Sequence, residues 1–518
     1  MTSPSAAGHD KLQPPPPSAP QSPAGPSALL EDYISRLSSS KLNLARQDRN
    51  LIGDVLATLS SRSSTRERIL PLSSLLTTST PTHFHVGTGL SATALLCSHI
   101  VRARREVLFV TCFWAASASL SLLRAALHEL NRRHLAWRAD DGGGGRDRKL
   151  KVRICFSSSG PFHKLFHTSS PLGKIHDAPE ALGLPPVAEL PGLDVRVKSL
   201  FYTPLSVLHG KFLVVDGRTL VVPSANVSWE KWGECATVFE GGGIVGVFVA
   251  FWRNVWGVGE FEEEEEEEEE EVEEREVEEG EDAADEFSND KVDGGGEDCY
   301  PTLFLPQPHH RNPRFFSFSF SPFSFSSSPS PPPTPQNTFF LSALAASASR
   351  IYLHSPNLTS KPLVAALAAA THRNVAVTIV TCRRMMTLEQ LVTTPFTYTE
   401  RCVRALVKDA KVGFLKLCYY KPPGVSAGGG GGEGGEEGVD KWHVKACVID
   451  DRVAVLGSAN ADRASWWTSQ EVNVAVFSER FAGCVKQRLE EGVRGRLESV
   501  CGGDDDTAAG ALDAGDIV

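Results

Sequence analysis

Two copies of one pattern of polar residues lie 234 positions apart in this sequence. The first copy consists of His209, Lys211, Asp216, Ser224 and Asn226, and the second of His443, Lys445, Asp450, Ser458 and Asn460. The spacing from each His to the other four positions is the same in both copies. A single His-x-Lys is common by chance, whereas two copies that match at five positions indicate a duplicated unit. The chain is therefore expected to fold as two related halves.

The segments that precede the two copies have the same expected order of elements. A strand, a helix and a second strand are expected first, over Val107–Trp114, Leu120–Arg133 and Lys149–Phe156. The same order is expected before the second copy, over Arg350–His354, Lys361–His372 and Asn374–Thr381. A further helix leads into each unit, over Gly89–Arg105 and Leu341–Ser349. This order is typical of a β-α-β unit with parallel strands, so scaffold and pattern were duplicated together.

Composition divides the chain into six segments. We expect a disordered Pro/Ser-rich segment over 1–28, a helical extension over 29–82, a first half over 83–258, a linker over 259–338, a second half over 339–500 and a disordered tail over 501–518. The expected linker is acidic at first and then rich in Phe, Ser and Pro. Its unbroken acidic run, Glu262–Glu271, repels itself and stays solvated, so no packed core is expected there.

The formal net charge of −11 is concentrated in the linker. Residues 260–298 hold 24 acidic residues against two basic ones, Arg275 and Lys291. Of the 63 acidic and 52 basic residues in the chain, 39 and 50 lie outside that segment. A basic remainder suits an anionic partner, but net charge does not distinguish phosphate, nucleic acid and a lipid surface.

Neither a signal peptide nor a membrane span is expected. The N-terminus is Pro/Ser-rich without an apolar run, and the best apolar stretch, Gly243–Trp252, is too short to cross a bilayer. The eleven cysteines include no Cys-x-x-Cys pair, and several lie in apolar runs, which is typical of a reducing compartment. We therefore expect an intracellular protein, cytoplasmic or bound peripherally to a membrane.

The repeated residues form a set suited to chemistry at phosphorus. Each His-x-Lys leads into a strand-forming run, so His and Lys share one face. A turn at Asp216-Gly217, and its counterpart at Asp450, returns the chain and brings Ser and Asn back beside them. Two such halves supply two imidazoles and four donor groups. One imidazole can attack a tetrahedral phosphorus while the other protonates the leaving oxygen, and Lys and Asn can hold the non-bridging oxygens.

Glu234 and Glu471 are candidates for carboxylates that fix the tautomer of each His. They follow Asn226 by eight residues and Asn460 by eleven, and the competing interpretation is a surface Glu at a helix end. No His, Cys and Asp cluster has zinc-site spacing, so neither a metal nor another cofactor is expected. Five tryptophans flank the copies and are expected to line a pocket or to pack in the core: Trp229, Trp232, Trp442, Trp466 and Trp467.

The duplicated His-x-Lys-x4-Asp pattern, followed by Gly-Ser-x-Asn, resembles the hallmark of the phospholipase D superfamily. The resemblance covers roughly residues 83–258 and 339–490, and the order of elements resembles the branch of cardiolipin synthases and bacterial-type phosphatidyltransferases. It implies an α/β fold of two homologous α/β/α sandwich halves that form one pseudo-two-fold active site. The reaction of that family is phosphodiester cleavage or exchange through a covalent phosphohistidine, without a metal.

The resemblance also implies a role for each repeated residue. His209 would be the nucleophile and His443 the general acid and base. The phosphoryl oxygens would be bound by Lys211, Lys445, Asn226 and Asn460, with Ser224 and Ser458 assisting. Asp216 and Asp450 are expected to be structural, because the hairpin turn directs them away from the phosphorus. Pro223 departs from the pattern, because it stands where Gly is usual and removes a backbone N–H.

These observations predict a metal-independent phosphodiesterase or phosphatidyltransferase that acts on phospholipid, of the phospholipase D or cardiolipin synthase type. Two alternatives stay open. One is a nuclease of the same superfamily, for which nucleic acid would be the partner. The other is a non-catalytic binding or scaffold protein that uses the linker for its partners. The sequence leaves open the head group and whether water or an alcohol accepts the phosphatidyl group.

Overall fold

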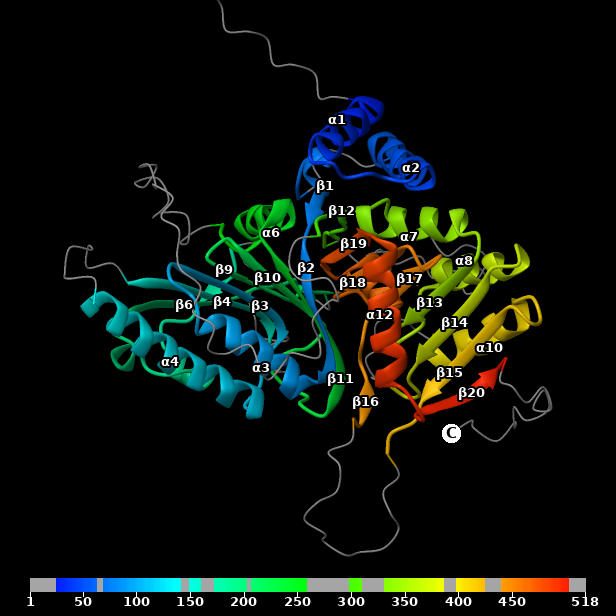
Figure 1. Cartoon of the computed structure of the whole chain (residues 1–518). Helices are drawn as coiled ribbons and strands as arrows, with labels where there is room; N and C mark the ends of the chain where they lie inside the picture. The colour runs from blue at the N-terminus through cyan, green and yellow to red at the C-terminus, as the bar shows by residue number, and fades with distance from the viewer. Residues whose placement is uncertain are drawn as a thin grey trace, which may run out of the picture.

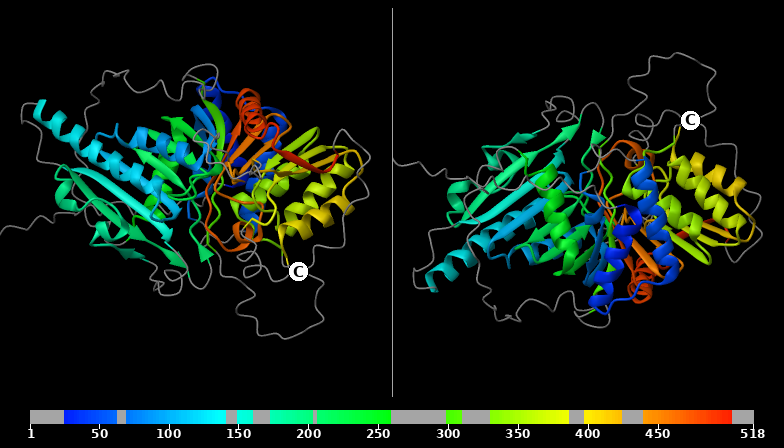
Figure 2. Two further views of the ribbon diagram at one scale, coloured as in Figure 1. Left: turned by 90° about the horizontal axis from the view of Figure 1, so that it is seen from below. Right: turned by 90° about the horizontal axis from the view of Figure 1, so that it is seen from above.

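A computed structural model describes residues 25–62, 69–140, 149–159, 172–202, 206–258, 298–309, 330–385, 397–423 and 439–502. Most of the expected disordered N-terminus (1–24), most of the expected linker and nearly all of the expected tail lie outside these residues. The expectation of disorder over 1–28 was wrong at its end, because residues 26–28 form the start of helix α1 (Pro26–Ser39). The described residues form two large mixed sheets with helices on both faces of each, as expected for an α/β fold (Figures 1 and 2).

The first sheet is built by the first half of the chain. Its strand order is β2, β11, β10, β9, β3, β4, β6, β5, and β16 joins it beside β11. Strands β3, β4 and β6 are parallel, while β9 is antiparallel to β3. The strands are β2 (Pro81–Thr88), β3 (Glu106–Phe113), β4 (Leu150–Ser158), β5 (Lys174–Ile175), β6 (Leu193–Ser199), β9 (Phe212–Val215), β10 (Thr219–Pro223), β11 (Trp232–Glu240) and β16 (Lys441–Trp442).

The second sheet repeats this order. Its strands run β12, β19, β18, β17, β13, β14, β15, β20, and β1 is added at the β12 edge. Strands β13, β14 and β15 are parallel, while β17 is antiparallel to β13. The strands are β1 (Leu76–Ser79), β12 (Tyr300–Phe304), β13 (Arg350–His354), β14 (Ala376–Thr381), β15 (Leu415–Tyr420), β17 (Ala446–Ile449), β18 (Val453–Gly457), β19 (Asn473–Phe477) and β20 (Leu497–Cys501).

Helices cover both faces of each sheet because the strand side chains alternate between two apolar faces. In the first half, Val107 and Phe109 of β3 pack with α3 and α4, while Leu108 and Val110 face the core that contains α6. The remaining long helices pack on the second half, either directly against its sheet or against a helix that covers it. The α-helices are α1 (Pro26–Ser39), α2 (Arg46–Arg62), α3 (Gly89–Ile100), α4 (Ala118–Asp140), α6 (Gly242–Val255), α7 (Pro335–Ala346), α8 (Lys361–His372), α10 (Thr399–Asp409), α11 (Arg463–Trp467) and α12 (Glu479–Gly492).

Short elements complete the chain. They are the 3-10 turns Leu72–Leu75, Pro179–Leu182 and Val187–Glu189, and the two-stranded pair β7 (Phe201–Tyr202) and β8 (Ser206–Val207). None of the helices in the described ranges is both long enough and apolar enough to cross a membrane.

Two sequence expectations were wrong around the linker and the N-terminal extension. The expected linker contains β12 and the start of α7, and the expected helical extension ends in β1 and the start of β2. β12 occupies the place in the second sheet that β2 occupies in the first, and Leu303 and Phe304 are buried. The apolar run that forms β12 is five residues long and follows an acidic segment, so composition concealed it. The helix expected over Gly89–Arg105 ends at Ile100.

The two halves are joined by strands that leave their own half. β16 of the second half pairs in parallel with β11 of the first, as Figure 1 shows at the centre of the molecule. β1 pairs with β12 in the second sheet, and β2 pairs with β11 in the first, so the chain crosses between the halves at Thr80. One hydrophobic core includes residues of both halves. The junction between the halves is therefore a packed, hydrogen-bonded interface.

Candidate active site

The two repeated histidines are held by the opposite half of the molecule. The backbone N–H of His209 donates to the carbonyl of Gln470 over 2.7 Å, and its ring Nδ1 lies 2.8 Å from Glu471 Oε2. The second half repeats this arrangement. The N–H of His443 donates to Gly233 over 2.8 Å, and its Nδ1 lies 2.7 Å from Glu234 Oε1. Each His thus pairs by its backbone with the residue before a Glu and by its side chain with that Glu.

Both carboxylates were predicted from the sequence, each beside the copy of the pattern that it follows. The structure crosses them, because the segment before each His lies beside the glutamate-bearing segment of the other half. The three extra residues between Asn460 and Glu471 are accommodated by the short helix α11, so the two carboxylates occupy equivalent places. The unequal spacing leaves the geometry symmetric.

Ser224 and Ser458 hold these carboxylates. The Ser458 hydroxyl donates to Glu471 Oε2 over 2.5 Å and accepts the Val472 N–H over 3.0 Å. Ser224 makes the same two contacts, with Glu234 and with the N–H of Cys235. Both serines are fully buried, and neither lines the pocket described below. They are placed to hold the carboxylates, which is compatible with the assisting role that the resemblance implied for them. Pro223 leaves Ser224 in place, since the Ser224 N–H still donates to Cys235.

Asp216 and Asp450 lie at the hairpin turns with positive φ angles of 54° and 53°. The Asp216 carboxylate accepts the backbone N–H groups of residues 104, 105 and 106 at 2.7–2.9 Å. The Asp450 carboxylate accepts those of residues 348, 349 and 350 at 2.7–3.2 Å. Each carboxylate thereby fastens its hairpin to the start of the neighbouring strand, β3 or β13. Neither residue lines the pocket.

The two lysines are buried beneath their histidines. Lys211 Nζ donates to the carbonyl of His209 over 2.7 Å, and Lys445 Nζ donates to the carbonyl of His443 over 2.6 Å. Lys445 Nζ also lies 3.0 Å from each ring nitrogen of His443. Burial lowers the pKa of Lys211 and lowers the pKa of Lys445 to about 8. Lys445 is therefore still charged near neutral pH, but its pKa lies only slightly above that pH.

The two histidines have different surroundings. The His443 side chain is 3% exposed, and burial lowers its pKa to about 4 although Glu234 acts in the opposite direction. The aromatic rings of Trp229 and Trp232 enclose it, with centroids 6.5 and 5.0 Å away. The His209 side chain is 15% exposed and reaches solvent. His443 is therefore neutral at pH 7.

Both carboxylates are ionised. Burial alone would raise the pKa of Glu234, but His443 and Lys445 outweigh it and hold that pKa below its usual range. His209 and Lys211 have the same effect on the pKa of Glu471. An ionised carboxylate at Nδ1 stabilises the protonated ring and fixes the neutral ring as the Nδ1–H tautomer. Nε2 of each ring is then the atom available for chemistry.

Asn226 and Asn460 face the same pocket with different contacts. Asn226 Oδ1 accepts the N–H of Phe113 over 3.0 Å, which fixes its carboxamide. Asn460 Nδ2 donates instead to Asp462 over 2.9 Å, and its Oδ1 is buried without a hydrogen-bond partner among the described residues. The two copies therefore differ in the hydrogen bonds of their asparagine side chains, although their histidines, lysines and serines make matching contacts.

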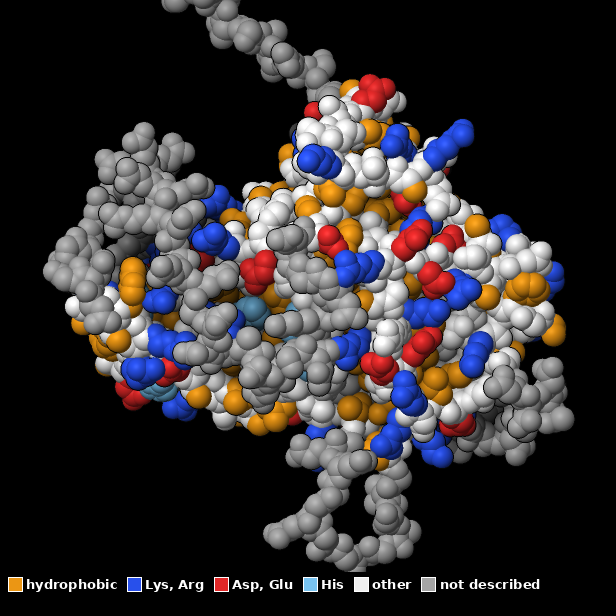
Figure 3. All heavy atoms as spheres, in the orientation of Figure 1, with side chains coloured by type: hydrophobic (Ala, Val, Ile, Leu, Met, Phe, Trp, Pro, Cys, Tyr) orange, Lys and Arg blue, Asp and Glu red, His pale blue; other side chains and the backbone are white. Residues whose placement is uncertain are grey.

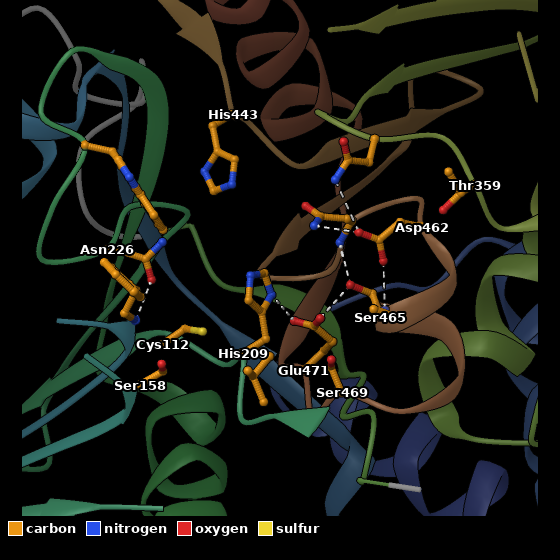
Figure 4. Close-up of a pocket in the computed structure, with 16 residues that line it drawn as sticks. Cys112, Ser158, His209, Asn226, Thr359, His443, Asp462, Ser465, Ser469 and Glu471 are labelled. Carbon is orange, nitrogen blue, oxygen red and sulfur yellow. Dashed lines mark hydrogen bonds and ion pairs between the residues drawn. The ribbon is translucent and has the colours of Figure 1, made fainter. Parts of the chain in front are cut away.

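His209, His443, Asn226, Asn460 and Glu471 line one pocket between the halves (Figure 4). It encloses about 780 Å³ of empty space, its open mouth included. The structure thus brings both histidines and both asparagines of the duplicated pattern together, with the lysines beneath them. Within the described part of the chain, no three His, Cys, Asp or Glu side chains are placed to hold a metal ion.

Several residues of the pocket were not identified from the sequence. They are Cys112, Phe113, Ser158, Val207, Asn357, Thr359, Asp462, Ala464, Ser465 and Ser469. Two signals were available. Asp462 follows Asn460 by two residues, and Phe113 lies six residues after Val107 of β3, as Asn357 lies six residues after the equivalent Ile351 of β13. Of the flanking tryptophans, Trp229 lines the pocket, with a positive φ of 54° that is unusual for a bulky residue.

Comparisons with known proteins match parts of this chain. A family model described as "Cardiolipin synthase, PLD-like domain" matches residues 340–492, which include the whole second copy of the pattern. The minor cardiolipin synthase ClsB of Bacillus subtilis (strain 168) is 40% identical over 53 residues. That segment is 10% of this chain and 13% of the relative, so the match spans a small part of the relative's length.

Two solved structures are also similar to this chain. Phosphatidylserine synthase from Haemophilus influenzae Rd KW20 has a TM-score of 0.47 and 11% identity, covering 82% of this chain and 90% of its own. Nuc, a phospholipase D family member from Salmonella typhimurium, has a TM-score of 0.24 and 16% identity, covering 32% of this chain and 91% of its own.

Proposed function

The chain belongs to the phospholipase D superfamily, in its cardiolipin synthase-like branch, and we propose that it catalyses phosphatidyl transfer or hydrolysis on phospholipids through a covalent phosphohistidine. The observation that carries the proposal is the pair of crossed contacts, His209 with Glu471 and His443 with Glu234, at one pocket. Two imidazoles oriented in this way can divide the reaction between a nucleophile and an acid.

In the first step, Nε2 of one histidine attacks the phosphorus of the lipid. A P–N bond forms, the bond from phosphorus to the head-group oxygen breaks, and the other histidine gives its Nε2 proton to that oxygen. In the second step, water or an alcohol attacks the phosphorus and gives its proton to Nε2 of the second histidine, the ring that protonated the head-group oxygen. The P–N bond then breaks, and both histidines return to their starting states.

We assign the attack to His443 and the proton transfer to His209, the reverse of the order implied by the resemblance. Attack requires a neutral ring, and both burial and the adjacent Lys445 ammonium keep His443 neutral. A general acid requires a ring whose protonated form is stabilised, so that it can give its proton to the leaving oxygen. His209 is partly exposed and lies against the ionised Glu471, which suits that task.

Lys211, Lys445, Asn226 and Asn460 are assigned to the non-bridging oxygens. Two ammonium groups supply the positive charge that stabilises a five-coordinate phosphorus. Lys445 now contacts the ring of His443, so it is expected to turn toward the phosphoryl group when substrate binds. Asp216 and Asp450 are assigned to the scaffold, because their carboxylates are saturated by backbone N–H groups.

A nuclease of the same superfamily is the competing function. Over the second half, basic and acidic side chains alternate on the face shown in Figure 3, so that part of the face lacks a single-sign track for a polyanion. A surface of mixed charge and a partly apolar pocket favour a phospholipid over a nucleic acid as the substrate. A scaffold without catalysis is disfavoured, because both copies keep His, Lys and Asn.

The test offers phosphatidylglycerol, phosphatidylcholine and single-stranded DNA to the full chain in the presence of a chelator. We expect turnover of lipid without turnover of DNA, and loss of activity in both His209→Ala and His443→Ala. Activity that requires the chelated metal, or that survives both substitutions, would contradict the mechanism. Turnover of DNA alone would replace the lipid by nucleic acid as the substrate.

A further inference from the structure

The second sheet carries a buried histidine, His354 of β13, where the first sheet has an apolar residue. His354 pairs with the residue three places after His443. Val110 of β3 pairs with the residue three places after His209, so it is the equivalent of His354. The His354 ring is fully buried, and burial lowers its pKa to about 3. It is therefore a neutral imidazole, and a polar ring at this depth is expected to have hydrogen-bond partners.

One ring nitrogen of His354 has a partner and the other has none. The indole N–H of Trp442 donates to His354 Nδ1 over 2.8 Å, and Trp442 directly precedes His443. An Nδ1 that accepts a hydrogen bond carries no proton, so the neutral ring is the Nε2–H tautomer. Nε2 is buried without a hydrogen-bond partner among the residues that the structure describes. A buried donor left unpaired in this way destabilises a fold, so an acceptor is expected beside it.

Asn460 has an unpaired acceptor. Its Nδ2 donates to Asp462 over 2.9 Å, whereas its Oδ1 is buried without a partner in the described ranges. In the first copy, the equivalent oxygen of Asn226 accepts the backbone N–H of Phe113 over 3.0 Å. No described group plays that part for Asn460. The second half has instead the unpaired N–H of His354.

His354 and Asn460 line one small interior cavity beside the active-site pocket, and Lys445 lines it too. Asn460 lines both spaces, so its carboxamide lies between them. Its Nδ2 faces Asp462, which lines the active-site pocket and not the cavity, so Oδ1 is the atom left for the cavity (Figure 4). Trp442 takes Nδ1 of His354 and does not line the cavity, so Nε2 is likewise the atom left for it.

The cavity has room for one water molecule. About 20 Å³ of it is open to the centre of a water-sized sphere, and roughly 10–15 Å³ in that measure holds one water. A larger ligand does not fit in this volume. The occupant must also accept from one side chain and donate to the other, which water does.

On the basis of the function proposed above, we propose that His354 and Asn460 bind a single buried water, and that this water positions the Asn460 carboxamide for the phosphoryl group. The water accepts from His354 Nε2 and donates to Asn460 Oδ1. Asp462 holds one N–H of Nδ2, and the second N–H is then directed to the active-site pocket. His354 is thus a positioning residue, which supplies through water the donor that Phe113 supplies directly to Asn226.

The first test looks for the water in a crystal structure of the full chain without substrate. We expect one ordered water within about 3 Å of both His354 Nε2 and Asn460 Oδ1. A dry cavity, or a direct hydrogen bond between the two side chains, would overturn the proposal. This result does not depend on turnover, so a chain that binds the water and consumes no phospholipid would refute the proposed function and not the water site.

Two substitutions of His354 separate its two hydrogen bonds. His354→Asn places an amide oxygen near the position of Nδ1, so it keeps the acceptor for Trp442 and removes the donor to the water. His354→Gln places an amide nitrogen near the position of Nε2, so it keeps the donor and removes that acceptor. With an activated phosphatidyl p-nitrophenyl ester, kcat should fall about tenfold in His354→Asn and at most about threefold in His354→Gln, with KM unchanged in both. The reverse order would show that His354 serves only as the partner of Trp442.

The same substitution in two asparagine backgrounds tests whether His354 acts through Asn460. His354→Asn should have no further effect on kcat in Asn460→Ala, because the carboxamide that the water positions is gone. In the matched background Asn226→Ala it should still reduce kcat about tenfold, since Phe113 and not the water holds that carboxamide. Equal reductions in the two backgrounds would overturn the positioning role.

Discussion

Replacing Glu471 by Gln keeps the shape of a fully buried side chain and removes its charge. Three donors meet this carboxylate: His209 Nδ1 at 2.8 Å, the Ser458 hydroxyl at 2.5 Å and the Ser465 hydroxyl at 2.6 Å. The amide can keep its oxygen toward His209 and Ser458 if its NH₂ group faces Ser465, whose hydroxyl rotates to accept. The substitution therefore isolates the effect of the negative charge on His209.

The charge matters when His209 is protonated. At an effective dielectric constant of about 20, a unit charge 2.8 Å from the ring nitrogen is worth about 6 kcal/mol. The hydrogen bond that the amide retains, together with solvent at the partly exposed ring, offsets part of this energy. A net loss of about 3 kcal/mol in the stabilisation of protonated His209 corresponds to a proton transfer to the leaving group that is roughly a hundredfold slower. The same loss applies to every step that needs the protonated ring.

The assay compares two lipid substrates that differ in their leaving group. Phosphatidylcholine leaves an alkoxide that needs a proton, whereas a phosphatidyl p-nitrophenyl ester leaves a stable phenolate. In Glu471→Gln, formation of the covalent intermediate should slow about a hundredfold with phosphatidylcholine and only slightly with the p-nitrophenyl ester. Glu234→Gln is the matched variant, and it should slow both substrates alike because Glu234 orients the attacking His443. Rescue of Glu234→Gln rather than Glu471→Gln by the activated ester would refute the assignment of roles.

Three further outcomes follow from the same contacts. Because the pKa of Lys445 is lowered to about 8, kcat/KM should fall as pH rises through about 8, and Lys445→Arg should move that alkaline limb upward in a pH–rate profile. Backbone N–H groups hold the pKa of Asp450 below its usual range despite partial burial, so its stabilisation is present above the unfolded pKa and is lost as pH falls through the folded one. Asp450→Asn should accordingly lower the free energy of unfolding by about 1–3 kcal/mol at pH 7 in urea titrations, and by less near pH 2. A Cβ on Gly233 would lie 2.5 Å from the Trp442 ring, so Gly233→Ala should reduce activity at least tenfold, whereas Gly246→Ala, which meets nothing within 4 Å, should not.

Much of the fold and site was accessible from the sequence because the signals are local or duplicated. The parallel strands and the helices between them follow from short apolar runs. The expectation that His and Lys share a strand face was close but wrong in its bounds, because both residues of each copy lie just before the strand, β9 (Phe212–Val215) or β17 (Ala446–Ile449). The α/β fold and the superfamily were predicted correctly. Roles of individual site residues stay predictions, which the experiments above address.

The features that the sequence concealed depend on contacts between distant segments. Glu471 and His209 are separated by 262 positions, and only the pairing of strands from opposite halves places them together. β12 was assigned to the linker because its five residues follow an acidic segment, although it completes the second sheet as β2 completes the first. Asp462 and Ser469 line the pocket but belong to no duplicated position with the same side chain, so the repeat gave no sign of them.

The central claim is a covalent phosphohistidine formed in a site shared by the two halves. It is tested most directly by quenching the reaction of the full chain with labelled phospholipid in alkaline denaturant and mapping the modified residue by mass spectrometry. We predict phosphatidyl-modified His443, in larger amount in His209→Ala when the p-nitrophenyl ester is used, and none in His443→Ala. Modification of His209 instead would reverse the roles. Continued turnover with neither histidine modified would contradict the account.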